Sequence, residues 1–152
     1  MDVRPARDGE AGELTELALA SKGHWGYDAE FLAACREELT MRPADIGRLR
    51  TRVAEEDGRV LGFTTLEGAP PQGALGMMFV APEALGRGIG RLLFEHTMTE
   101  ARRLGFVRLT IDADPNAEPF YLAMGAVRVG ATPSGSIPGR VLPLLEYDLT
   151  TG

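Results

Sequence analysis

The chain has 152 residues, and its 22 acidic residues outnumber its 16 lysines and arginines, which gives a formal charge of −6. This length is typical of one domain, so we expect a single domain over residues 1–152. The acidic balance argues against a nucleic-acid partner, because neutralising phosphates requires a basic face. No segment approaches the ~18 apolar residues of a membrane span, and the N-terminus does not resemble a signal peptide. The single cysteine, Cys35, excludes an internal disulfide and a cysteine-based zinc site. We therefore expect a cytoplasmic protein.

The first half of the chain predicts an edge strand, two helices and a β-hairpin. The edge strand covers Val3–Ala6, where a proline is tolerated, and the first helix covers Ala11–Ser21. Asp28 is the expected N-cap of the second helix. Met41–Leu49 contains a proline and a glycine and is expected to be a loop. An Asp-Gly pair at 57–58, between two strand-like segments, is a strong hairpin signal.

The second half alternates strands and helices without a strict order. A strand over Ala74–Val80 leads into a glycine-rich segment and then a helix that ends at Leu104, before Gly105. The remaining predicted elements are a strand over Val107–Ile111, a short helix from Pro119 to Gly125, and two strands over Ala126–Ala131 and Leu142–Leu149. The resulting order, β-α-α-β-β-β-α-β-α-β-β, is that of a mixed α/β protein.

The glycines of Gly86-x-Gly88-x-Gly90 lie between a predicted strand and a predicted helix. Glycines let the backbone approach a ligand, and free N–H groups at a helix start point at phosphate oxygens. A nucleotide P-loop requires Gly-Lys-Ser/Thr, but Gly90 is followed by Arg91-Leu92. A dinucleotide fingerprint requires its third glycine where Arg91 stands. A coenzyme A pyrophosphate loop and a tight turn without a ligand are the two interpretations that are left.

The segment Val80–Gly90 resembles motif A of the GNAT superfamily of acetyl-CoA-dependent N-acetyltransferases. In that motif a strand ending in V-x-P leads to Q/R-x-x-G-x-G/A at a helix start. Gly88-Ile89-Gly90 matches its G-x-G, with Arg87 directly before it. Leu85 stands at the leading Gln/Arg position, where it could act only through its backbone N–H.

The segment Asp112–Gly125 resembles motif B of the same superfamily, with Asn116 and Tyr121 as its polar residues. Segments near the N-terminus and Ile137–Pro143 also resemble one bacterial branch, so the resemblance covers essentially the whole chain. It implies an α/β (α+β mixed) GNAT-like acyl-CoA N-acyltransferase fold. We expect a mostly antiparallel central sheet of about seven strands, flanked by about four helices.

The resemblance implies an N-acetyltransferase that moves the acetyl group of acetyl-CoA to a primary amine of an unidentified acceptor, expected to be a small molecule. A thiolate leaves readily, so direct transfer in a ternary complex is the simpler expectation. Cys35 is then a buried thiol rather than a nucleophile, and no metal is implied. Two alternatives stay open: a non-catalytic acyl-CoA-binding or sensing domain, and an enzyme that acetylates protein N-termini.

The resemblance also implies which residues form the site. Tyr121 is the expected general acid beside the departing sulfur, and Asn116 the expected contact to the pantetheine arm or the acceptor. A backbone N–H within Met78–Val80 would polarise the acetyl carbonyl, because the family separates this strand from the next. The residues expected to bind the co-substrate are Met78, Phe79, Val80, Leu85, Gly86, Arg87, Gly88, Ile89, Gly90, Arg91, Asn116 and Tyr121.

The general base has several candidates, because the strand before the glycine segment carries no acid. His24 titrates in the useful range and is the expected catalytic base; Glu67 and a water chain are the others. Trp25 and Tyr27 are expected to wall the acceptor pocket. We do not expect the protein to bind a membrane. Homodimers are common in this family, and both a monomer and a homodimer are open.

Overall fold

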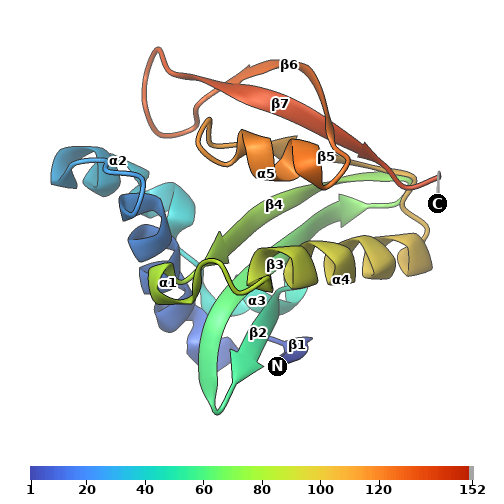
Figure 1. Cartoon of the computed structure of the whole chain (residues 1–152), viewed down its shortest axis with the longest axis horizontal. Helices are drawn as coiled ribbons and strands as arrows, with labels where there is room; N and C mark the ends of the chain where they lie inside the picture. The colour runs from blue at the N-terminus through green and yellow to red at the C-terminus, as the bar shows by residue number, and fades with distance from the viewer. Residues whose placement is uncertain (151–152) are drawn as a thin grey trace.

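Residues 1–150 are described in the computed structural model, whose ribbon is drawn in Figure 1. They form a seven-stranded sheet in the order β1-β2-β3-β4-β5-β7-β6. All neighbouring strands are antiparallel except β4 and β5, which are parallel. The strands are β1 (Asp2–Pro5), β2 (Arg52–Glu56), β3 (Arg59–Ala69), β4 (Gln72–Val80), β5 (Arg108–Asp112), β6 (Val127–Pro133) and β7 (Val141–Asp148). The predicted mixed fold and mostly antiparallel sheet are confirmed.

Helices pack against the sheet and bury its apolar side chains. α4 crosses in front of the sheet, α1 and α2 lie at the left of the view, and α5 lies below β6 and β7 (Figure 1). The helices are α1 (Ala11–Gly23), α2 (Ala29–Leu39), α3 (Pro43–Arg48), α4 (Ile89–Leu104) and α5 (Glu118–Ala123). As predicted, Asp28 caps α2 by accepting a 2.8 Å bond from the Phe31 N–H, and Gly105 ends α4 in the left-handed conformation.

The buried side chains form two clusters. The first joins α1, α2 and α3 to β2, β3 and the start of α4. The second joins the rest of α4 to β5, β7 and α5. Their fully buried members include Leu14, Phe63 and Leu93 in the first cluster, and Phe94, Leu109 and Leu145 in the second. None of the helices within residues 1–150 combines the length and the apolarity needed to cross a membrane.

The expectation of a loop over Met41–Leu49 is wrong, because Pro43–Arg48 forms α3. Pro43 stands in the first turn, where its missing N–H costs nothing and its restricted φ favours a helix. The side chain of Ile46 is 2% exposed and anchors the turn in the first cluster. The structure therefore has a fifth helix where about four were expected.

β4 and β5 separate after a short contact. Only Gln72–Ala74 pairs with Arg108–Thr110, although β4 continues to Val80. Beyond Ala74 the edge of β4 that faces β5 has no strand partner within the described chain, while the other edge stays paired with β3. Free backbone groups on such an edge can bond an extended ligand.

His96 lies on α4 and is half-buried, and its Nε2 is enclosed without a hydrogen-bond partner among residues 1–150. Burial, and next the charge of Arg52, lower the pKa of His96 below its ordinary value, while Glu100 opposes them. The folded state therefore holds the neutral imidazole. The unfolded state binds more protons as the pH falls through the ordinary histidine pKa of about 6.5.

We predict that the free energy of unfolding decreases between about pH 8 and pH 5, and that His96→Gln makes this decrease smaller. Denaturant titrations of both proteins at the two pH values measure the effect. The matched control is His24→Gln, which makes the same substitution at the other, exposed histidine of the chain. An unaltered dependence in His96→Gln would contradict the assignment.

Candidate active site

The glycine-rich segment connects β4 to α4 through a short 3-10 turn, η2 (Pro82–Ala84). Gly86 and Gly88 have φ values of 81° and 80°, in the left-handed region that glycine adopts without strain. A Cβ added at either position would meet no atom within 4 Å, so both residues border open space. Leu85, directly before them, is exposed.

At the start of α4, a row of backbone donors has no partner. The N–H groups of residues 86–91 form no hydrogen bond within residues 1–150, and the first N–H to do so is that of Leu92, which bonds the Gly88 carbonyl at 3.0 Å. Unpaired N–H groups and the helix dipole together favour an anion there. The neighbouring cations are paired on the surface: Arg87 with Glu56 at 2.7 Å and Arg91 with Glu95 at 2.9 Å.

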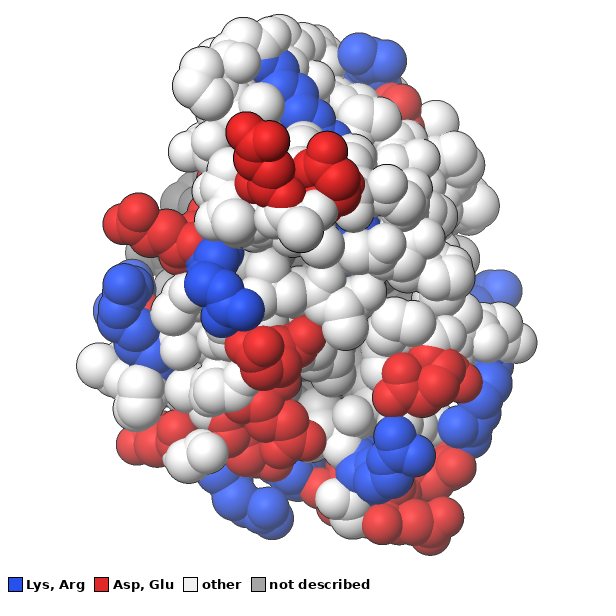
Figure 2. All heavy atoms as spheres, turned by 90° about the vertical axis from the view of Figure 1, so that its left-hand side faces the viewer, with Lys and Arg blue, Asp and Glu red and all other residues white. Residues whose placement is uncertain are grey.

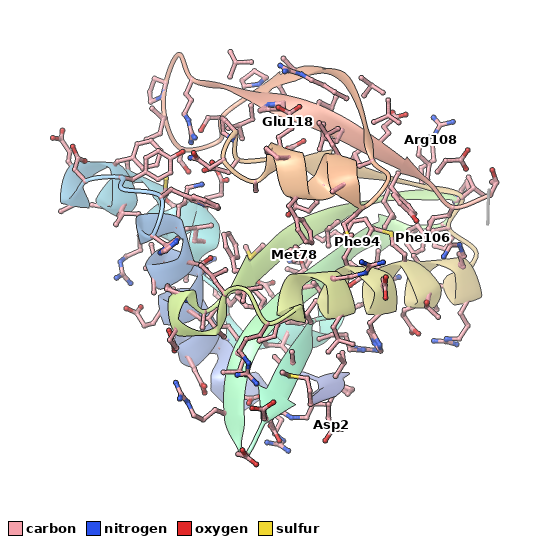
Figure 3. All side chains as sticks on the ribbon, viewed as in Figure 1. Asp2, Met78, Phe94, Phe106, Arg108 and Glu118 are labelled. Atoms are coloured by element: carbon pink, nitrogen blue, oxygen red, sulfur yellow. The ribbon has the colours of Figure 1, made fainter. Side chains whose placement is uncertain are left out.

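The free edge of β4 faces the start of α4 and α5. Figure 3 shows Met78 in the space between β4 and α5. A Cβ on Gly90 would lie 3.4 Å from the Phe120 ring and 3.8 Å from the Met78 methyl group, which are ordinary contact distances. The predicted co-substrate residues Met78 and Gly90 therefore lie close together, beside the free edge of β4.

Tyr121 lies on α5 and is 6% exposed. Its ring packs against Phe94 and Phe120, with centroid distances of 6.3 and 5.4 Å. Burial, and next the negative charge of Asp114, raise the pKa of the Tyr121 phenol well above its ordinary value of 10.0. The hydroxyl thus keeps its proton at neutral pH and can act as a proton donor.

Asp114 is the centre of a polar cluster that joins distant segments of the chain. Its carboxylate accepts hydrogen bonds from the Tyr27 hydroxyl at 3.0 Å, the Lys22 ammonium at 3.1 Å and the Asn116 side-chain amide at 3.0 Å. Burial acts to raise the pKa of Asp114, but the Asn116 N–H and the Lys22 charge outweigh it and hold the pKa below its usual value. The side chain is 11% exposed, so the cluster is largely shielded from water.

Arg140, from the loop between β6 and β7, completes this cluster. Its Nη2 donates to the Tyr27 hydroxyl at 2.7 Å and lies 3.5 Å from the Asp114 carboxylate. Its guanidinium lies 4.9 Å from the Phe31 ring centre and 5.2 Å from that of Tyr27. Tyr27 and Asn116 are predicted site residues, whereas the ionic members Lys22, Asp114 and Arg140 are not. The one available signal was that Lys22 is the only lysine of the chain.

Glu67 lies on β3 beside the free stretch of β4. The β3–β4 register shifts between Thr65 and Leu66, which leaves Gly76 without a paired residue, and the Glu67 carboxylate occupies the space that a side chain on Gly76 would take. The Thr65 hydroxyl donates to Glu67 at 2.9 Å and accepts the Met77 N–H at 2.8 Å. The carboxylate is thereby oriented over β4.

The other residues predicted around the acceptor lie at the end of α1. His24 follows the last residue of that helix, and its ring makes an edge contact with Trp25 at 5.8 Å. Trp25 is 45% exposed. Of the predicted residues of this loop, Tyr27 alone bonds to other site residues within residues 1–150. The face on the side of α1 and α2 carries interspersed acidic and basic side chains (Figure 2).

Comparison with known proteins agrees with this geometry. Residues 13–134 match the family model described as an acetyltransferase (GNAT) domain. The peptidyl-lysine N-acetyltransferase YiaC of Escherichia coli (strain K12) is 36% identical over 126 residues, which cover 81% of each chain. The 5-NmdU N-acetyltransferase of Pseudomonas phage PaMx11 is 29% identical over 138 residues, 88% of this chain and 91% of that protein.

Solved structures share the fold at lower sequence identity. A GCN5-related N-acetyltransferase from Rhodopseudomonas palustris superposes with a TM-score of 0.79 at 24% identity, covering 97% of this chain and 94% of that one. The PaiA N-acetyltransferase of Thermoplasma acidophilum, in complex with coenzyme A, gives 0.78 at 18% identity over 97% and 98% of the two chains. Because the family model spans most of the sequence, the chain belongs to the GNAT family of acetyltransferases.

Proposed function

We propose that this protein transfers an acetyl group from acetyl-CoA directly to a primary amine of a small-molecule acceptor, in a ternary complex. The carrying observation is the row of unpaired N–H groups at residues 86–91, beside the unpaired edge of β4. The first suits a pyrophosphate and the second an extended pantetheine arm. Coenzyme A in the PaiA structure, and acetyl-CoA in that of YncA from Salmonella typhimurium, support the same co-substrate here.

The co-substrate would lie along the start of α4 and the free edge of β4. Residues 86–91 would hold the phosphates through backbone N–H groups, whereas the Leu85 N–H already donates to the Pro82 carbonyl at 3.4 Å. Met78–Val80 would pair with the pantetheine amides and polarise the acetyl carbonyl. Asn116 already bonds Asp114 and Tyr27, so its part in this proposal is to orient those two residues on the acceptor side.

Tyr121 is the proposed general acid. Its raised pKa keeps the hydroxyl protonated, and no competing hydrogen bond to that hydroxyl is found in the part of the chain described. As the acetyl carbon–sulfur bond breaks, the phenol would donate its proton to the thiolate. A thiolate is a fair leaving group, so a covalent acetyl-enzyme is unnecessary. Cys35, which is 3% exposed within the first core cluster, supports direct transfer.

Glu67 is the proposed general base. Its carboxylate is aimed across Gly76 at β4, has no ion-pair partner among residues 1–150, and receives a bond only from Thr65. The incoming ammonium must lose a proton before its nitrogen can attack. That proton goes to Glu67, which passes it to solvent, and the new nitrogen–carbon bond forms. As the carbon–sulfur bond breaks, Tyr121 protonates the thiolate, and the second proton of the attacking nitrogen is returned to the Tyr121 phenolate, which leaves a neutral amide. The His24 side chain is exposed, and its imidazole forms no hydrogen bond within residues 1–150. Both facts favour Glu67 over His24 as the base.

A peptidyl lysine is the second candidate acceptor, because YiaC is a peptidyl-lysine N-acetyltransferase. Release of free coenzyme A against a panel of small amines and lysine-containing peptides tests both acceptors. We expect turnover with small amines. Turnover with peptides alone would replace the proposed acceptor class. Binding of acetyl-CoA without turnover of either would indicate a sensing domain.

We predict that Gly88→Glu weakens coenzyme A binding about 100-fold or more, because its side chain would enter the phosphate site and repel the ligand. Calorimetry with the folded variant measures this. Gly58→Glu is the matched control, because Gly58 has a φ of 78° and borders open space in the β2–β3 hairpin. If both variants bind coenzyme A like the parent, the phosphate assignment is wrong.

We predict that Tyr121→Phe lowers kcat by roughly tenfold to a hundredfold, with KM for acetyl-CoA near the parent value. The hydroxyl acts mainly as charge builds on sulfur, so the transition state loses more than the ground state. Tyr147→Phe is the control, because the Tyr147 ring also packs against Phe94. This variant should keep the parent kcat. Normal turnover of Tyr121→Phe would reduce Tyr121 to a packing residue.

We predict that Glu67→Gln lowers kcat/KM for the amine by about 10²–10⁴-fold at neutral pH and leaves coenzyme A affinity unchanged. The deficit should shrink towards about pH 10, where the amine loses its proton unaided. Steady-state kinetics of Glu67→Gln and His24→Gln across this range separate the two candidate bases. A large, pH-dependent deficit in His24→Gln alone would assign the base to His24.

A further inference from the structure

The cluster around Asp114 holds more positive than negative charge. Lys22 and Arg140 share the single carboxylate of Asp114, while Tyr27 and Asn116 are neutral. No other carboxyl group within residues 1–150 forms an ion pair with either cation. Glu38 bonds Ser136 at 2.9 Å and acts electrostatically on Asp112, but neither forms an ion pair with Lys22 or Arg140 within residues 1–150. One positive charge is thus left without a counter-charge in a site shielded from water.

Both cations also have donors to spare. Arg140 makes its two bonds through one nitrogen, Nη2, and its Nε and Nη1 groups bond to nothing in the described chain. Lys22 uses one of the three donors of its ammonium. The side chains are 18% and 13% exposed, and neither has an enclosed nitrogen without a partner among residues 1–150. The spare donors are therefore accessible to an incoming anion, which can accept charge-assisted hydrogen bonds from them.

The positions of the two cations are preorganised. Tyr27 and Phe31 stack with ring centres 4.0 Å apart, and the Arg140 guanidinium lies against both rings. The Lys22 ammonium bonds Asp114 and lies 5.7 Å from the centre of the Tyr27 ring. Charged groups held in this way lose little entropy when they bind a ligand. A guanidinium offers paired donors that match the oxygens of a carboxylate or phosphate.

The cluster also lies close to the proposed site of acetyl transfer. Asp114 acts electrostatically on the Tyr121 phenol, and the two residues come from one segment of the chain. The cluster is contributed by α1, the start of α2, the loop after β5 and the β6–β7 loop. It is separate from the glycine segment at the start of α4, where the coenzyme A phosphates are proposed to bind.

We propose that Lys22 and Arg140 bind an oxyanion, a carboxylate or phosphate, carried by the acceptor itself. This inference rests on the proposed acetyltransferase function. It makes the acceptor an amino acid-like or aminoalkyl phosphate compound whose amine is positioned for acetylation by its anionic end. An acceptor without an anionic group leaves one positive charge of the cluster without a counter-charge and is bound less well.

The test compares acceptors that differ in the anion alone. We would measure kcat/KM for 4-aminobutyrate and 6-aminohexanoate against their amides, and for 2-aminoethyl phosphate against ethanolamine. One charge-assisted interaction favours the anionic member of a pair by about 10- to 100-fold. The carboxylate and phosphate arms show which oxyanion is preferred. Calorimetric binding of the same compounds to the coenzyme A-bound protein gives a readout that does not depend on turnover.

Arg140→Gln and Lys22→Gln should each lower kcat/KM for the anionic acceptors about 10-fold or more and barely change that for the uncharged ones. Coenzyme A affinity should stay at the parent value. Arg128→Gln is the matched control, because Arg128 lies on β6 of the same hairpin and pairs with Glu118 outside the cluster. It should leave the preference for anions intact. Arg140→Lys should restore part of the preference because it keeps the charge.

The outcomes separate this inference from the proposed function. Turnover of anionic and uncharged amines at equal kcat/KM overturns the anion site and leaves the acetyltransferase in place. An equal loss for both acceptor series in Arg140→Gln makes Arg140 a purely structural residue. Weaker coenzyme A binding in Arg140→Gln assigns the cations to the co-substrate instead. Preferred binding of anionic amines without turnover supports the anion site and overturns the proposed acetyl transfer to small amines.

Discussion

The separation of β4 from β5 is the constraint on which the rest of the site depends. Two neighbouring parallel strands normally pair along their length, but here the pairing stops after Gln72–Ala74. Backbone groups that a continuous sheet would consume are left for a ligand. Because the sheet and the packed helices hold both strands in place, the strands are separated without any ligand between them.

The proposed acid and the proposed base come from different elements of the fold. The α5 helix supplies Tyr121, whose burial keeps its proton in place. The β3 strand supplies Glu67, which can lie over β4 because Gly76 has no side chain and because the register shift leaves that residue unpaired. An acid and a base held by separate elements allow one proton to be taken from the attacking amine and another to be given to the departing sulfur.

Asp114 brings together the residues that are proposed to bind the acceptor. Segments as distant as Lys22 and Arg140 converge on one carboxylate, which orders the loop before α2 and the loop before β7 together. Such a buried ionic cluster is a weak source of stability, because desolvation offsets much of the attraction. Its more evident consequence is to hold two cations, with donors unused, beside the proposed reaction site.

The sequence by itself determined the features that depend on local physics. Apolar periodicity gave the long helix α4, the Asp-Gly pair gave the hairpin, and the glycine spacing of residues 86–90 gave the left-handed turn before α4, because each depends on neighbouring residues alone. Resemblance to a known family added the fold and the proposed role of Tyr121. A proline and a glycine in Met41–Leu49 suggested a loop, yet the burial of Ile46 and a proline in the first turn allow α3.

Tertiary structure alone decided which polar residues meet. Lys22, Tyr27, Asp114 and Arg140 lie in segments whose approach depends on how α1, α2 and the β6–β7 loop pack around the sheet. No local pattern encodes that approach. The orientation of Glu67 likewise depends on a register shift between two strands and on the absence of a side chain at Gly76. Contacts between residues distant in the chain are set by packing of the whole sheet, which a pattern of neighbouring residues does not contain.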